Sequence, residues 1–352
     1  MTRAWSRESV PAHRGVSSRV AGVLCGVVGG SLVLLSALWA VGAIYYAPLS
    51  GERARAVLAV LWPLATAVAF VWIRPRRRAL IGYAIVFAAL VALWFQIPAS
   101  NQRDWQSEVA RTPYATIHGD TVTVHNVRNF SYRTETDFDP VWETRTYDLR
   151  ELDSADLIAV YWAGKAIAHI MLSFGFAGRD YLAVSIETRK EKGEGYSTLA
   201  GFFRQYELYY VVADERDVVR VRTTYRKPQE DVYIYRVQGS SGNLRRVFLD
   251  YLNSINELHQ QPRFYNTLLT NCTTSVWLHT RMNPESPPLS WKILLSGYVP
   301  DYLHDLGRLD TSMSFAELER RSLVNARAHA AEKDPAFSQR IREGLPLAAL
   351  HP

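Results

Sequence analysis

One cysteine in this chain stands where a reactive thiol could be held. Cys272 lies in the polar run "NCTT" at residues 271–274, with Asn271 in position to cap a helix that begins at the cysteine. The first turn of a helix offers unpaired backbone N–H groups and the positive end of the helix dipole. Both favour a thiolate, and both can bind a developing oxyanion. Cys272 is therefore predicted to be a nucleophile. The alternative is that it is a small buried residue that only packs and does not react.

A thiol nucleophile requires an imidazole within hydrogen-bond reach, and His169 is the predicted base. His279 follows Cys272 by seven residues, which places it about 10 Å away along the same helix and excludes contact with the sulfur. The alternative for His169 is a structural histidine of a strand. Three other histidines are predicted at the surface of strands or near a helix end: His118, His125 and His259.

A third polar group is expected to orient the imidazole. Because side chains alternate between the two faces of a strand, His169 can face Ser185 or Glu187 on a neighbouring strand. Glu187 is preferred, since a carboxylate best stabilises the imidazolium that forms during proton transfer. The alternative is an ion pair of Glu187 with one of two nearby basic residues, Arg189 and Lys190.

Four polar residues are predicted to contact substrate. Asn271 stands beside the cysteine, and the segment "FFRQYE" supplies Arg204, Gln205 and Tyr206, for which a structural role at a strand end is the alternative. No pair of His or Cys stands at metal-ligand spacing near Cys272, and the chain has no nucleotide-binding glycine motif. The sequence therefore predicts neither a metal nor another cofactor.

The segments that position these residues are predicted to be mostly strands. Residues 114–150 read as short strands with a turn at Gly119-Asp120, and "AIAHIMLSFGF" (166–176) and "DYLAVSIETR" (180–189) read as a β-hairpin. Further strands are predicted at 206–213, 217–226 and 231–237.

Helical periodicity begins further along the chain. Apolar residues in 243–261 recur at the spacing of one helix face. A second helix is predicted to start at Cys272, with Val276 and Trp277 packed inward. The tail at 311–344 has a charged, helical pattern.

Three apolar stretches precede the polar part of the chain. Val20–Ala47, Ala56–Ile73 and Ala79–Ile97 contain 28, 18 and 19 residues, and about 20 helical residues cross a bilayer core. The first stretch is too long for a cleavable signal peptide, and two more follow it. The sequence therefore predicts three transmembrane helices; the alternative is buried helices of a soluble protein.

Basic residues flank two ends of these stretches and predict their orientation. They precede the first stretch and separate the second from the third: Arg3, Arg7, Arg14, Arg19, Arg74, Arg76, Arg77 and Arg78. Both of these ends are therefore expected in the cytoplasm. Residues 98–352 are expected on the other side of the membrane, which is the periplasm beyond a bacterial inner membrane if the source is Gram-negative.

The charge of the polar part of the chain argues against nucleic acid as a partner. Residues 1–100 hold ten basic and two acidic residues, whereas residues 101–352 hold 30 and 32, so the polar part has a net charge of −2 and no basic surplus for nucleic acid.

The two cysteines, Cys25 in the first apolar stretch and Cys272, cannot pair. A free thiol in an exported domain is unusual, so Cys272 is either inert and buried or kept for its reactivity.

Four motifs together resemble a known family: "AHIMLSFGF", "SIETRKEKGEGYS", "GFFRQYELYYVVADERDVVRVR" and "FYNTLLTNCTT". They are similar to the Lnb N-terminal periplasmic domain family, which is named after a bacterial lipoprotein N-acyltransferase, over roughly residues 100–280. The resemblance implies an α+β fold of permuted, papain-like NlpC type, with a Cys-bearing helix on an antiparallel sheet. It also implies that Cys272 is the nucleophile and His169 its base.

The expected function is that of a membrane-tethered Cys-His acyltransferase. The resemblance and the tether favour a phospholipid as acyl donor and a lipoprotein or other amine as acceptor, with a thioester between them. Two alternatives remain: a cell-wall peptidase or amidase of NlpC type, and a non-catalytic membrane binding protein. The expected domains are a membrane segment at 1–97, a thiol-enzyme domain at 98–310 and a helical tail at 311–352.

Overall fold

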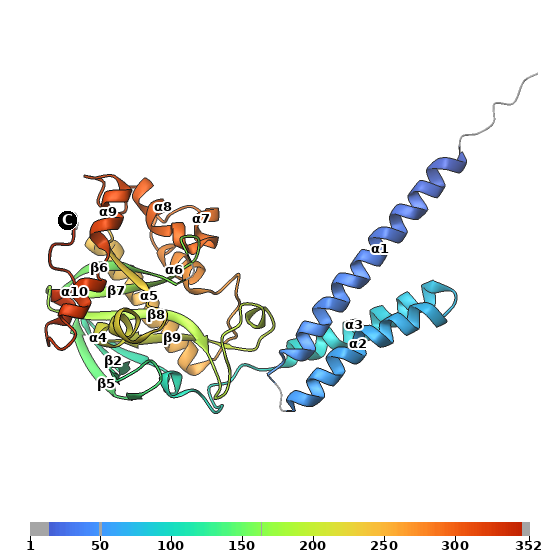
Figure 1. The fold of residues 1–352 in the computed structure, drawn as a ribbon, viewed down its shortest axis with the longest axis horizontal. Helices are drawn as coiled ribbons and strands as arrows, with labels where there is room; N and C mark the ends of the chain where they lie inside the picture. Colours follow the sequence, from blue (N-terminus) through green and yellow to red (C-terminus); the bar gives the residue numbers. More distant parts are fainter. Residues whose placement is uncertain (1–13, 49–50, 163, 347–352) are drawn as a thin grey trace, which may run out of the picture. The chain divides into compact units, whose positions relative to one another are not determined.

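The computed structural model describes residues 14–48, 51–162 and 164–346. The chain divides into two compact units between Pro98 and Ala99. Figure 1 shows the helices of the first unit and, in the second, a sheet with surrounding helices. The predicted mixed α+β class of the polar domain is confirmed, and the domain contains an eight-stranded sheet.

The first unit consists of α1 (Arg14–Tyr45), α2 (Glu52–Trp72) and α3 (Arg76–Gln96). All three helices are long and apolar enough to cross a membrane. Their large apolar side chains, such as that of Leu34, are mostly exposed, as expected for surfaces that face lipid. The length and composition of the three helices confirm the prediction of three apolar helices that can cross a membrane. Two of the arginines behind the predicted orientation, Arg3 and Arg7, lie outside the described residues.

The second unit is built on a sheet with the strand order β1-β2-β9-β8-β7-β6-β10, in which β5 pairs with β2. Neighbouring strands are antiparallel except β2 and β9, which are parallel. The strands are β1 (Tyr114–His118), β2 (Thr121–Arg128), β5 (Trp142–Asp148), β6 (Leu152–Tyr161), β7 (Ala168–Phe176), β8 (Asp180–Arg189), β9 (Glu207–Ala213) and β10 (Asp231–Arg236). A separate pair joins β3 (Ser131–Tyr132) to β4 (Phe138–Asp139).

Several of the predicted strands are confirmed. Gly119 has a φ of 61° in the turn between β1 and β2, a conformation that glycine adopts without strain. The predicted hairpin is formed by β7 and β8, with the register Met171↔Ser185. The strands predicted at 206–213 and 231–237 correspond to β9 and β10.

One face of the sheet packs against two helices, α5 (Ser241–Gln260) and α6 (Cys272–Thr280). The apolar stripe of α5 is buried as its helical spacing predicts, and Phe248 contacts Phe174 of β7 with ring centroids 4.9 Å apart. On α6, Val276 is buried and Trp277 is half-buried. The helix begins at Cys272 with Asn271 as its cap, as predicted.

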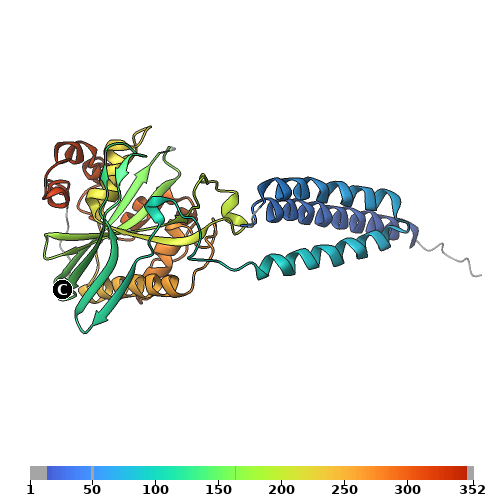
Figure 2. The same cartoon turned by 90° about the horizontal axis from the view of Figure 1, so that it is seen from below.

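The opposite face of the sheet is covered by helices that include α10 (Asn325–Ala330) and α11 (Phe337–Arg340) of the tail, as Figure 2 shows. Its core contains Met171 and Ala183 of the sheet, together with Phe337 and Ala328 from the tail. The helices after α6 are α7 (Trp291–Leu294), α8 (Val299–Asp305), α9 (Phe315–Ser322), α10 (Asn325–Ala330) and α11 (Phe337–Arg340), with a short 3-10 turn η4 (Ser296–Tyr298) between α7 and α8.

The prediction of a strand at 217–226 is wrong. This segment is helical: α4 (Glu215–Arg220) runs directly into a short π-helical segment η3 (Val221–Tyr225). Asp214 caps the start, where its carboxylate accepts the backbone N–H of Arg216 at 2.8 Å. The β-branched composition favours a strand locally, but the cap and tertiary packing decide the conformation. Helical spacing then buries one side of the segment against the sheet: Val218, Val219 and Arg222.

Candidate active site

Cys272 is the first residue of α6, and its thiol is half-buried. The side-chain oxygen of Asn271 accepts the backbone N–H groups of Thr273 at 3.0 Å and Thr274 at 2.8 Å, which fixes the start of the helix. The backbone N–H of Cys272 itself has no partner among the described residues. That N–H is therefore available to an oxyanion that forms next to the sulfur.

The thiol lies beside the start of β7. The backbone N–H of Ile170, which follows His169 in the chain, interacts with the Cys272 thiol, and the Thr273 hydroxyl lies 3.7 Å from the sulfur. In the described residues, β7 and β8 pair only as far as Met171↔Ser185, whereas β8 continues to pair with β9 as far as Arg189↔Glu207. The two strands therefore separate beside the helix start. This separation lets groups from the two sides of the sheet approach one another.

His169 is held by a chain of hydrogen bonds. Its Nε2 lies 2.6 Å from the Ser185 hydroxyl, which donates to Oε1 of Glu187 at 2.8 Å. Because the single hydroxyl proton of Ser185 goes to Glu187, the Ser185 oxygen accepts from Nε2–H of His169. The other ring nitrogen, Nδ1, then carries the lone pair and has no hydrogen-bond partner among the described residues. It is the nitrogen that can act as a base.

Arg222 anchors this chain from η3. Its guanidinium is buried, with only 4% of the side chain exposed, and donates to Oε1 of Glu187 at 3.0 Å. Burial disfavours ionisation of Glu187, but the charge of Arg222, together with smaller contributions from His169, Arg128 and the Ser185 hydrogen bond, holds the pKa of that carboxyl well below its usual range. Glu187 is therefore ionised and can hold the His169–Ser185 pair in one orientation.

The two reactive groups rest in their neutral forms. Burial, reinforced by the charge of Arg222, lowers the pKa of His169 to about 4. Burial also raises the pKa of the Cys272 thiol, although the Ile170 N–H opposes that shift. The arrangement suits proton transfer from thiol to imidazole during attack on a substrate, rather than a preformed ion pair.

Alkylation of Cys272 is expected to accelerate steadily with pH. Because its pKa is raised, the thiolate fraction should increase about tenfold per pH unit between about pH 6 and pH 8. The measurement is the rate of iodoacetamide labelling in a Cys25→Ser background, where Cys272 is the remaining thiol. A rate that is constant across this range would contradict the neutral resting state, because it would indicate a thiolate already paired with imidazolium.

Three of the predicted substrate contacts lie in the loop before β9. The Tyr206 hydroxyl donates to the Gly195 carbonyl at 2.6 Å and accepts the Ser197 N–H at 3.0 Å, so it ties this loop together. The Gln205 amide donates to the Glu194 carboxylate. The Arg204 guanidinium lies over the Phe264 ring, 5.4 Å from its centroid. These contacts are structural, and a role in substrate binding stays a prediction for each residue.

The side chain of Asn271, the fourth predicted contact, is engaged by the helix cap and donates to the Thr267 carbonyl at 2.9 Å. His279 is buried away from the thiol. It lies 2.7 Å from Asp250 and 2.8 Å from the Tyr210 hydroxyl. The exclusion of His279 as the base of Cys272 is consistent with these contacts. The three remaining candidates occupy exposed or half-buried positions: His118, His125 and His259.

The sequence does not reveal the part played by Arg222. Its segment was predicted to be a strand, in which Arg222 would share a face with Val218 but not with Val219. The helical spacing of these three positions is the signal that groups them on one buried side. The interaction of the Ile170 N–H with the thiol leaves no signal in the sequence, because it arises from the backbone.

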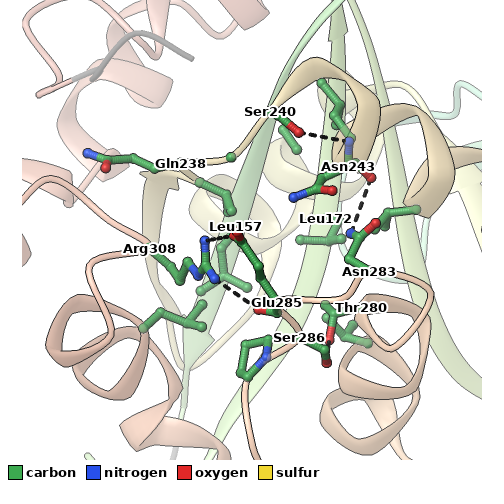
Figure 3. Close-up of a pocket in the computed structure, with 18 residues that line it drawn as sticks. Leu157, Leu172, Gln238, Ser240, Asn243, Thr280, Asn283, Glu285, Ser286 and Arg308 are labelled. Carbon is green, nitrogen blue, oxygen red and sulfur yellow. Dashed lines mark hydrogen bonds and ion pairs between the residues drawn. The ribbon is translucent and has the colours of Figure 1, made fainter. Parts of the chain in front are cut away.

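An apolar pocket of about 130 Å³ lies further along α6 (Figure 3). Leu157 and Leu172 from the sheet and Val276 from α6 line it, and Arg308 donates to the carboxylate and carbonyl of Glu285 beside it at 3.2 and 2.9 Å. Neither Cys272 nor His169 lines this pocket. The described residues contain no group of three or more His, Cys, Asp or Glu side chains placed to hold a metal ion.

Fold and site together define a mixed α+β domain, joined to membrane helices, in which a helix-terminal cysteine faces the start of a histidine-bearing strand. Residues 138–297 match the model of the Lnb N-terminal periplasmic domain family. The predicted resemblance is confirmed, with a matched region that begins and ends later than expected. The chain is thus a bacterial membrane protein with a periplasmic domain. No curated protein and no solved structure matches it.

Proposed function

We propose that this chain is a membrane-tethered acyltransferase that works through a thioester on Cys272. The observation that carries the proposal is the ordered chain Arg222–Glu187–Ser185–His169, in which His169 Nδ1 has no partner among the described residues. His169 directly precedes Ile170, whose backbone N–H interacts with the Cys272 thiol. An ionised, half-buried carboxylate behind a histidine is an arrangement that orients the base of a thiol nucleophile.

The first half of the reaction forms the acyl-enzyme. The thiol proton passes to Nδ1 of His169 while the sulfur attacks the ester carbonyl of the donor. The backbone N–H of Cys272 donates to the oxyanion of the tetrahedral intermediate. When the intermediate collapses, the ester C–O bond breaks, and the proton on Nδ1 passes to the departing alcohol. The products are a lysophospholipid and an S-acylated Cys272.

The second half transfers the acyl group to an acceptor. An amine attacks the thioester carbonyl, His169 takes a proton from its nitrogen, and the thiolate of Cys272 leaves and recovers that proton. The products are an N-acylated acceptor and the free enzyme. Because three apolar helices place the domain at the membrane, a phospholipid donor and a lipoprotein amine are the substrates that the tether favours.

The proposal includes a permuted papain-like fold of NlpC type. It is supported by a cysteine at the start of a helix that packs on β7 and β8, and by a histidine near the start of β7. His169 precedes Cys272 in the chain, the order expected of the permuted form. The thiol-enzyme domain is proposed to cover residues 98–310.

The choice of donor tests the proposal. The full chain is incubated separately with a phospholipid labelled in its acyl chain and with a labelled peptidoglycan fragment. We expect protein-bound label from the phospholipid alone. Label or cleavage with the peptidoglycan fragment alone would contradict acyl transfer and favour a cell-wall peptidase or amidase. Absence of reaction with both would favour a non-catalytic membrane protein.

The orientation of the chain is a separate proposal, motivated by the arginines that flank the apolar helices. The N-terminus is proposed to be cytoplasmic and the polar domain periplasmic. A reporter that is active only in the cytoplasm, fused after Pro352, is expected to be inactive, whereas the same reporter fused before Met1 should be active. Activity of the C-terminal fusion would contradict this orientation.

A further inference from the structure

Two loops beside Cys272 present a cluster of exposed apolar side chains. Leu268 and Leu269 are 50% and 63% exposed, and Leu199 and Phe202 are 55% and 39% exposed. We call these four residues the apolar rim. Exposed large apolar side chains that lie together mark surfaces that contact another apolar phase.

The two loops are bound to each other, so the rim is one surface. The Thr267 hydroxyl donates to the Thr198 carbonyl at 2.7 Å, and the Thr267 N–H donates to the Gly201 carbonyl at 3.2 Å. A side chain at Gly201 would lie 2.3 Å from the Thr267 hydroxyl oxygen, so this close approach requires glycine. The loops are therefore fixed against each other by two hydrogen bonds and by the close approach of Gly201 to the Thr267 side chain.

The turn that carries the two leucines is also rigid. The side-chain oxygen of Asn266 accepts the N–H groups of Leu268 and Leu269, each at 3.0 Å. The Thr274 hydroxyl of α6 donates to the Leu268 carbonyl at 3.1 Å. The leucines are thus held outward by hydrogen bonds, only a few residues before Cys272.

The connection to the membrane helices is short. The 21 residues of α3 span about 30 Å, the thickness of a bilayer core, so Gln96 is expected at one membrane surface. Only three residues separate Gln96 from Ser100, whose N–H donates to the Glu207 carboxylate at 3.1 Å. A chain of this length reaches at most about 14 Å, so Glu207 must lie close to the membrane surface.

Glu207 adjoins both loops of the rim. It is the first residue of β9, five positions after Phe202, and it forms a β-bridge with Phe264, four positions before Leu268. The point at which the tether joins the domain therefore lies beside the apolar rim.

From the rim and the tether, we infer that Leu199, Phe202, Leu268 and Leu269 insert into the bilayer surface. Apolar side chains on a protein surface bind lipid in proportion to the apolar area that they bury at the interface. Insertion would set the start of α6 at the level of lipid ester groups. This inference concerns membrane contact and goes beyond the proposed chemistry.

The test uses the full chain with both native cysteines replaced by serine, reconstituted in vesicles of phosphatidylethanolamine and phosphatidylglycerol. A polarity-sensitive fluorophore is attached at Leu199→Cys or at Leu269→Cys, and nitroxide-labelled phospholipids serve as quenchers. Both positions are exposed, so the substitutions leave the core intact. We expect these phospholipids to quench both labels several-fold more strongly than a label at Asp180→Cys.

Asp180 is the matched control because its side chain is 63% exposed and it lies at the far end of β8, about 30 Å from Arg189 along the strand. Equal, weak quenching at all three positions would overturn the inference. Shielding of the rim labels from aqueous iodide without quenching by lipid would also overturn it, because a protein surface would then cover the rim. The readout needs no enzymatic turnover, so it is independent of the proposed acyl transfer.

Discussion

Replacement of Cys272 by alanine is expected to abolish acylation of the protein by phospholipid. Nucleophilic catalysis splits transfer into two steps, and the first step needs only the donor. Without an acceptor, wild-type protein should therefore accumulate label that neutral hydroxylamine removes, as a thioester requires. Removal of the nucleophile should lower this labelling by at least about a thousandfold. The measurement is protein-bound label after denaturing electrophoresis.

Two variants make this result specific. Cys25→Ala removes the other thiol, which lies in the exposed apolar surface of α1, and should leave labelling unchanged. Cys272→Ser retains a hydroxyl at the same place, but should also remain unlabelled because an alkoxide is much harder to form than a thiolate at neutral pH. Label that persists in Cys272→Ala would show that another residue carries the acyl group.

Replacement of His169 by alanine is expected to slow labelling by roughly a hundred- to ten-thousandfold, the usual contribution of a positioned general base. The physical reason is the loss of Nδ1 as the proposed acceptor of the thiol proton, since Ser185 already donates its proton to Glu187 and contacts the ring at Nε2. The rate of thioester formation from phospholipid measures the effect.

The control for His169 is His118→Ala, a histidine on the exposed part of β1, which should label at the wild-type rate. Added imidazole should partly restore labelling of His169→Ala, because a small base can occupy the vacated space. An unchanged rate in His169→Ala, with wild-type thermal stability, would exclude His169 as the base and leave Cys272 as nucleophile.

Local patterns in the sequence predict much of the frame around the site. The stripe of α5, the cap at Asn271 and the alternation in β7 and β8 are local signals, and each matches the observed element. Alternation also placed His169 on the side of Ser185 and Glu187. In the structure the two residues lie in series, with Ser185 between the imidazole and the carboxylate.

Long-range contacts could not be predicted in the same way. Arg222 belongs to a β-branched segment that resembles a strand, and only the Asp214 cap and the packing against the sheet make it helical. The separation of β7 from β8 beside α6 depends on how three elements meet. The sequence shows which charged residues are present, but only the fold shows that Glu187 pairs with Arg222. Arg189 donates instead to the Val109 and Ala110 carbonyls.

Peptide mapping of the acylated protein by mass spectrometry tests the central claim most directly. The full chain in vesicles of one defined phospholipid is digested after a short incubation without acceptor. The proposed mechanism predicts that the peptide containing Cys272 gains the mass of that phospholipid's acyl group, and that hydroxylamine removes it. An unmodified Cys272 peptide, or the same acyl mass on a different residue, would contradict the account.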